Sequence, residues 1–122
     1  EVTVKTHTDG FPPCSDLFFE DGSVIFSHLA ADNTHLAISD PNKLPELITF
    51  WKNAQKADYV MSSHLQVIGK SGIEFTLTYV EKAEDAFNDA NSKEAFIAKM
   101  KAAYPNAGMD FFLMMTAKNF YK

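Results

Sequence analysis

Alternation of apolar and polar residues opens the chain. In EVTVKTHT, residues 1–8, valine alternates with polar residues, which is the period-two pattern of a half-buried strand. Two apolar runs follow, LFF at 17–19 and VIF at 24–26, and they flank Asp21 and Gly22. An Asp-Gly pair between apolar runs is typical of a two-residue hairpin turn. The two runs are therefore predicted to pair as a β-hairpin.

A helical pattern comes next and is followed by a short strand. Asp40 suits an N-cap and Pro41 the first helical position. Apolar residues from 44 to 54 recur three and four apart, which predicts an amphipathic helix reaching about Ala57. DYVMSS, residues 58–63, is short and apolar and predicts a buried strand. Strand, helix and strand in this order indicate a crossover within a sheet covered by helices.

The second half of the chain has helical periodicity throughout. Apolar residues keep helical spacing over 71–90. Asn91 can cap the next helix, with Glu94 three residues later as in a capping box. The apolar residues that form one face of this helix lie within 96–104. Residues 109–121 are apolar nearly all round, which favours a helix that is buried in the core or pressed against a partner.

These elements predict an α/β (α+β) fold in a single domain over 1–122. Residues 1–70 form a β-rich sheet portion with one helix, and 71–122 form a helical extension. Hydrophobic residues make up 46% of the chain, enough for a substantial core. The net charge is −5 and every cationic residue is lysine, so nucleic acid is not an expected partner. No apolar run is long enough for a transmembrane helix, and EVTVKTHT lacks a signal-peptide layout. A soluble protein is expected, in a compartment that the sequence does not indicate.

Three histidines are the main chemical candidates. His7, His28 and His64 each fall where a predicted strand runs into a loop. Ligands of open α/β sheets collect at such an edge. Imidazoles that converge there would suit Zn²⁺, which favours nitrogen ligands. The alternative is that these histidines are ordinary surface residues, each with its own hydrogen bonds.

Three further residues are candidates for ligand binding or for supporting a metal site. His35 lies in the loop after His28, and Asp9 and Asp32 could supply carboxylates. Both aspartates also fit ordinary turn chemistry. Cys14 is the only cysteine, which excludes an internal disulfide, and no neighbouring base marks it as a nucleophile.

Several stretches together resemble the C-terminal half of the metallo-β-lactamase fold, an αββα sandwich. The resemblance covers nearly the whole chain. The matching stretches are THTDG at 6–10, DLFFEDGSVIFSHL at 16–29, AADNTHLAI at 30–38, ADYVMSSHLQVIGK at 57–70 and the tail at 79–105.

The resemblance implies metal-ligand roles for some histidines and also shows departures. His7 and His64 match ligand positions of the family, and His28 falls at or beside its metal-bridging aspartate. Here Ser27-His28 replaces the family's Gly-Asp, and residues 62–65, SSHL, replace Pro-Gly-His-Gly. The family's first metal motif, His-x-His-x-Asp-His, does not occur in this sequence. One copy therefore offers at most three histidines to a site that needs five or more ligands.

Three hypotheses follow. The first is a degenerate, non-catalytic relative of this fold that acts as a binding or interaction module. The second is a zinc-dependent hydrolase half-domain completed by another chain. The third is a small structural α/β domain with incidental histidines. Half of a sandwich would leave an apolar sheet face uncovered. A homodimer, a partner chain or the helical tail is therefore expected to cover that face.

Overall fold

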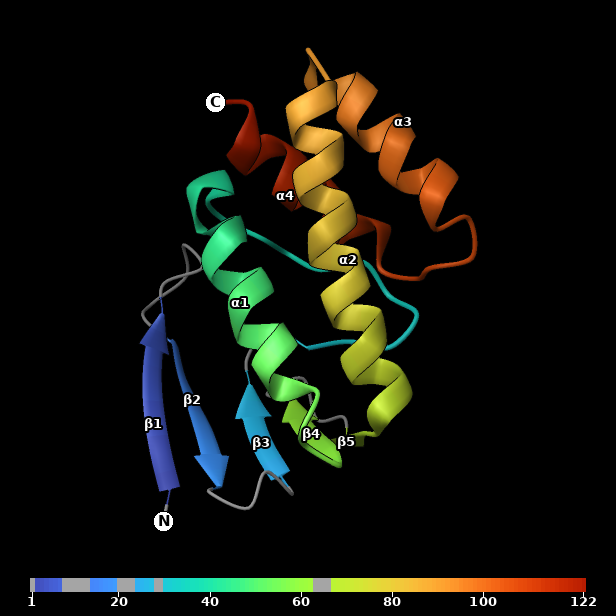
Figure 1. The fold of residues 1–122 in the computed structure, drawn as a ribbon. Helices are drawn as coiled ribbons and strands as arrows, with labels where there is room; N and C mark the ends of the chain where they lie inside the picture. The colour runs from blue at the N-terminus through green and yellow to red at the C-terminus, as the bar shows by residue number, and fades with distance from the viewer. Residues whose placement is uncertain (1, 8–13, 20–23, 28–29, 63–66) are drawn as a thin grey trace.

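The computed structural model describes residues 2–7, 14–19, 24–27, 30–62 and 67–122, with side chains for 30–61 and 67–122. The described parts form one five-stranded sheet and four α-helices (Figure 1). The predicted mixed α/β class is confirmed. The interruption at 8–13 and the hairpin turn at 20–23 lie outside the described residues.

The sheet has strand order β1-β2-β3-β4-β5. Its strands are β1 Val2–His7, β2 Cys14–Phe19, β3 Val24–Ser27, β4 Tyr59–Ser62 and β5 Val67–Ile68. Neighbouring strands are antiparallel except β3 and β4, which are parallel. The predicted hairpin is confirmed as β2 and β3, and the predicted crossover is confirmed between β3 and β4. The sequence pattern gave no indication of β5.

The crossover contains a short 3-10 turn, η1 Pro41–Lys43, and the helix α1 Leu44–Ala54. A carboxylate oxygen of Asp40 accepts a hydrogen bond from the backbone N–H of Asn42, so Asp40 caps this turn as predicted. The helix ends earlier than the predicted Ala57.

Three helices follow: α2 Lys70–Asp89, α3 Lys93–Ala103 and α4 Asp110–Phe120. The predicted cap of α3 was one residue off. Ser92, not Asn91, is the N-cap, since its hydroxyl accepts from the N–H of Ala95 at 3.1 Å. Among the described residues, no helix is both long and apolar enough to cross a bilayer.

The helices lie on one side of the sheet. In Figure 1, α1 and α2 rise above the β3–β5 end of the sheet, while α3 and α4 lie farther away, at the end of α2 opposite the sheet. Contacts join α2 to β4 and β5, α1 to α2, and α3 to both α2 and α4. The helical tail therefore packs on α2 and does not fold across the far face of the sheet.

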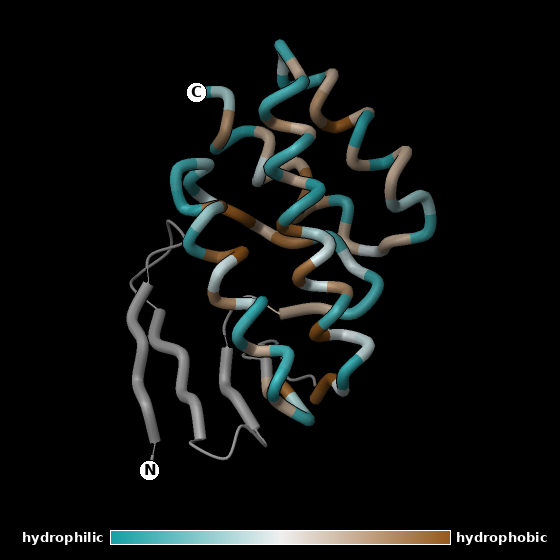
Figure 2. Tube along the Cα trace, viewed as in Figure 1, coloured by the Kyte–Doolittle hydropathy of each residue, from teal (hydrophilic) through white to brown (hydrophobic). Residues whose placement is uncertain are grey.

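Residues 30–39 form the centre of the helical layer, although they have almost no regular secondary structure. Figure 2 shows a hydrophobic stretch crossing behind the two front helices. Leu36 and Ile38 are buried there, together with the largest enclosed side chains, Trp51, Tyr79 and Phe96. The core of the described residues thus lies mainly between helices and this segment.

Two threonines supply hydrogen bonds that an extended segment cannot make by itself. Thr76 of α2 accepts from the N–H of Ala31 at 3.1 Å, and its hydroxyl lies 2.9 Å from the carbonyl of the same residue. Thr116 of α4 accepts from the N–H of Ile38 at 2.8 Å and donates to the carbonyl of Leu36 at 2.8 Å. Since buried backbone groups need partners, these threonines hold residues 30–39 from two helices.

Candidate functional site

The ends of three strands meet at one edge of the sheet. β1, β3 and β4 run in the same direction, because β1 and β3 both pair antiparallel with β2, and β4 pairs parallel with β3. Their last residues are His7, Ser27 and Ser62, and Ser27 and Ser62 are partners in register. In the sequence, His28 directly follows Ser27, and His64 comes two residues after Ser62.

The three predicted metal ligands are not described as side chains. His28 and His64 lie outside the described residues, as does Asp9, and His7 is described only by its backbone. β1 and β4 are three strand spacings apart, about 14 Å. A zinc ion spans only about 4 Å between two nitrogen ligands. The two imidazole side chains would have to bridge most of the remaining distance in a shared site.

His35, a predicted ligand or supporting residue, is enclosed in the helical layer. Its exposed fraction is 1%. Its Nδ1 lies 2.9 Å from the hydroxyl of Tyr79, and its Nε2 lies 3.8 Å from a carboxylate oxygen of Asp110. Burial lowers the pKa of His35. The charge of Asp110 opposes this shift, and the charge of Lys101 adds to it. The ring is therefore held neutral between fixed partners.

Tyr79 connects this histidine to an aromatic cluster. Burial raises the pKa of Tyr79, and a backbone hydrogen bond from Leu36 opposes that shift. The hydroxyl oxygen of Tyr79 accepts the hydrogen bond from Leu36, so the hydroxyl proton can be donated to Nδ1 of His35. This arrangement favours the His35 tautomer that carries its proton on Nε2. The ring of Tyr79 packs on Phe75 and Tyr104 with centroids 5.9 and 5.0 Å away. These contacts give His35 a packing role.

Asp32, the other described candidate, has a different set of contacts. It is exposed and accepts a hydrogen bond from the hydroxyl of Ser71 at 3.2 Å, in the first turn of α2. A carboxylate near a helix N-terminus is electrostatically favourable. Within the part of the chain that the structure describes, no three His, Cys, Asp or Glu side chains are grouped to hold a metal ion.

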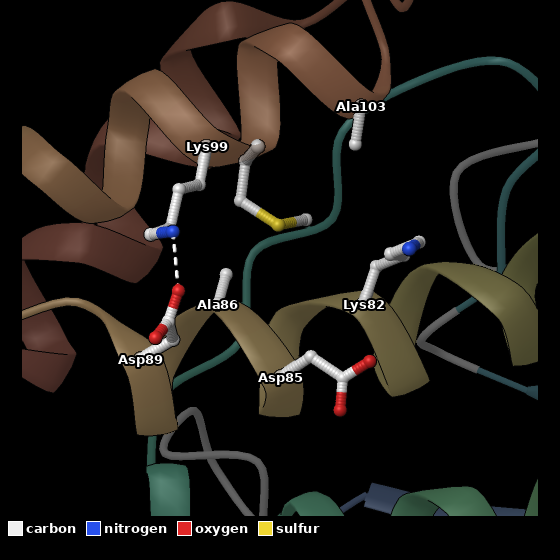
Figure 3. A pocket seen from close by; sticks show the side chains of 7 residues that line it. Lys82, Asp85, Ala86, Asp89, Lys99 and Ala103 are labelled. Atoms are coloured by element: carbon white, nitrogen blue, oxygen red, sulfur yellow. Dashed lines mark hydrogen bonds and ion pairs between the residues drawn. The ribbon is translucent and has the colours of Figure 1, made fainter.

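A groove between α2 and α3 has a volume of about 320 Å³ (Figure 3). Lys82, Asp85 and Asp89 line it from α2, and Lys99 lines it from α3. Lys99 forms an ion pair with Asp89, and this contact lowers the pKa of the Asp89 carboxyl. Two lysines and two aspartates thus line the groove, so their formal charges balance and favour no ligand of one sign.

The apolar C-terminal helix is buried on one side only. Leu113, Ala117 and Phe120 of α4 belong to the core, as the sequence predicted. Phe111 and Met114 are 67% and 51% exposed on its other side. The same helix therefore contributes both core and apolar surface.

The second apolar surface lies on the sheet, on the side away from the helices. Val60 and Ile68 are register partners and are buried, whereas Met61 and Val67, also register partners, are 39% and 66% exposed. Tyr59 is 54% exposed. β4 was predicted to be buried, but only one of its faces is. We call the side of Met61 and Val67 the open face.

Register extends the open face across all five strands. Laterally paired residues share one face of a sheet. One continuous row of partners on the open face is apolar throughout: Val4, Leu17, Phe26, Met61 and Val67. The paired positions Val2–Phe19 and Val24–Tyr59 belong to the same face. β5 has no alternation in the sequence, and its only local signal is the adjacent pair of β-branched residues Val67 and Ile68.

Comparison of this chain with models of protein families, with curated proteins and with solved structures found no match.

Proposed function

We propose that this chain is a non-catalytic interaction module that binds another protein layer through the open face of its sheet. The observation that carries this proposal is the exposure of Tyr59, Met61 and Val67 on two neighbouring strands. Contiguous apolar surface that spans a whole sheet marks an interaction site more often than a solvated surface.

The polarity of the two faces of the hairpin supports the same conclusion. Lys5 and Asp16 are register partners. Each lies two positions along its strand from the pair Thr3 and Phe18, so the two pairs share one face of the sheet. The row of Thr3 and Phe18 continues across β3 to the buried Val60. The charged pair therefore belongs to the face that the helices occupy elsewhere. The pairs Val2–Phe19 and Val4–Leu17 belong to the open face, together with the uncharged polar pair Thr6–Ser15. A sheet that faced water on its open side would have the opposite pattern.

The resemblance to half of a metallo-β-lactamase fold agrees with this proposal. In the complete αββα sandwich, the corresponding sheet packs against the sheet of the other half. The departures at 27–28 and 62–65, and the lack of the family's first metal motif, argue against hydrolysis by this chain alone. Loss of a bridging carboxylate would remove an anionic group that helps to hold two cations together.

Binding of a hydrophobic fluorescent dye tests whether the open face is available. We expect dilute wild-type protein to bind the dye, and the double variant Met61→Lys/Val67→Lys to bind much less. The matched control is Phe111→Lys/Met114→Lys, which removes two apolar residues of α4 that are at least as exposed in total. Circular dichroism checks that each variant is folded. Equal binding by wild type and the sheet variant would refute the proposed function.

A zinc-dependent hydrolase half-domain completed by another chain is the second candidate. One observation favours it: β1, β3 and β4 end at the same edge, beside the sequence positions of His7, His28 and His64. Three imidazoles and a water could hold one zinc ion and lower the pKa of that water.

Elemental analysis tests this candidate directly. Stoichiometric zinc in the purified protein, lost in His7→Ala, His28→Ala and His64→Ala, would support it. His35→Ala is the control, because the structure gives this ring other partners. Protein without zinc after purification in zinc-containing buffer would contradict it.

A further inference from the structure

We infer that the open face is covered by a second copy of this chain, with the two sheets packed face to face. This inference rests on the proposed function and names its partner. In such a dimer, β4 and β5 of each copy would bury Met61 and Val67 against the sheet of the other. Two sheets that pack in this way lie about 10 Å apart, with their strand directions about 30° from each other.

The size of the open face is sufficient for a weak dimer. Strands lie about 4.8 Å apart and residues rise about 3.3 Å, so five strands of this length present roughly 350 Å² of sheet plane. Two copies would cover roughly 700 Å² of plane, and side-chain relief makes the accessible area larger. The plane area alone is below the lower end of stable interfaces, about 1,200 Å². A dimer that dissociates on dilution is therefore expected.

The chemistry of the open face favours self-association. No charged residue occupies an open-face register position in the described strands, although the chain has 11 lysines and 16 acidic residues. A partner selected by charge would need a matching charge on this face. Apolar, uncharged rows are complementary to themselves. A twofold dimer also brings the same patch together from both copies, so no second kind of surface is needed.

Methionine oxidation locates the interface without any substitution. Met61 is on the open face at 39% exposure, and Met114 is on α4 at 51%. Oxidation by dilute peroxide is measured by mass spectrometry from low to high micromolar protein. If the inference holds, oxidation of Met61 slows several-fold as the concentration rises, while Met114 is unchanged. Slowing of Met114 alone would place the contact on α4 and overturn the inference.

Sedimentation velocity on the wild type and two single variants completes the test. We expect a monomer–dimer equilibrium that Val67→Lys weakens by roughly tenfold or more, because it would bury an unpaired ammonium group. Met114→Lys should leave the equilibrium unchanged. A wild type that stays monomeric at high micromolar concentration would overturn the second-copy inference. If its dye binding still depends on Met61 and Val67, the proposed function stands and the partner is a different chain.

Discussion

The hydroxyl of Tyr79 lies 2.9 Å from Nδ1 of His35, and both side chains are buried. The backbone N–H of the same histidine donates to the carbonyl of Gly108 at 2.8 Å. The pair therefore fastens residues 30–39 to α2 and to the connection between α3 and α4. This is why His35 has a packing role, although its sequence context suggested a ligand.

Removing one hydroxyl from this cluster should destabilise the protein, and removing another should not. Tyr79→Phe leaves the buried Nδ1 of His35 without its partner, so we expect a loss of about 1–3 kcal/mol in the free energy of unfolding. Tyr104→Phe is the matched control, since the buried Tyr104 hydroxyl has no hydrogen-bond partner. That change should be neutral or slightly stabilising. Urea unfolding of both variants measures the difference, and equal losses would contradict the assignment.

The lowered pKa of His35 predicts a specific pH dependence. The unfolded chain takes up a proton at His35 near its ordinary pKa of 6.5, whereas the folded state does so only at lower pH. The stabilisation from neutral His35 is therefore complete above that pKa and declines as pH falls toward the folded value. Asp110 favours the charged ring, and Lys101 opposes it.

Comparison with His35→Gln separates this effect from the other titrating groups. The difference in unfolding free energy between wild type and His35→Gln should shrink as pH falls from about 7 to about 5. Urea unfolding at several pH values checks this. A difference that stays constant over that range would show that burial does not shift the pKa of His35.

The two buried threonines should each matter to stability. Thr76→Val would leave the N–H of Ala31 without its partner, and Thr116→Val would do the same to the N–H of Ile38. We expect each change to cost about 1–3 kcal/mol, because valine matches threonine in shape and removes only the hydroxyl function. The exposed Thr78, also on α2, provides the control. Thr78→Val with a similar loss would mean that the measurement reports helix propensity.

Close packing of α2 on β5 requires a glycine. A Cβ atom at Gly72 would lie 2.7 Å from Cβ of Ile68, which is too close for an unstrained contact. Gly72→Ala should therefore destabilise the protein by about 1–3 kcal/mol, although alanine is the better helix former. Thermal unfolding of Gly72→Ala, and of the same change with Ile68→Gly, which removes the opposing Cβ, tests this. The second substitution should remove most of the effect of the first.

The cap of α3 can be assigned by two alanine substitutions. Ser92→Ala removes the hydroxyl that accepts from Ala95, and a loss of about 1 kcal/mol is expected. Asn91→Ala should change stability by only a few tenths of a kcal/mol. A larger effect at Asn91 than at Ser92, measured by urea unfolding, would support the capping assignment made from the sequence.

Local patterns in the sequence predicted most of the fold. The β2–β3 hairpin, the Asp40 cap and the crossover to β4 all depend on short-range features, and the structure confirms them. β5 could not be predicted because two residues are too few for a period. The sequence placed His35 in a loop, and nothing local marked residues 30–39 as the centre of a core. Their partners, Thr76 and Thr116, are 45 and 78 positions away from the residues they bond.

The candidate site was less predictable than the fold. Spacing placed His7, His28 and His64 at strand ends, and the shared direction of β1, β3 and β4 agrees with that placement. Whether these imidazoles bind zinc stays a prediction. An uncovered apolar sheet face was expected from the resemblance, but alternation in a strand does not reveal which of its residues lie on the face that the helices leave open. Only the exposure of Met61 and Val67 distinguishes the two faces.

Residues 30–39 also affect how this chain can be engineered. Surface loops usually accept inserted peptides, new chain termini and fused domains. This segment would not, since its backbone is bonded to α2, α4 and Gly108 and its side chains form the middle of the core. Insertions and affinity tags belong elsewhere, for example near the exposed Asn106 between α3 and α4.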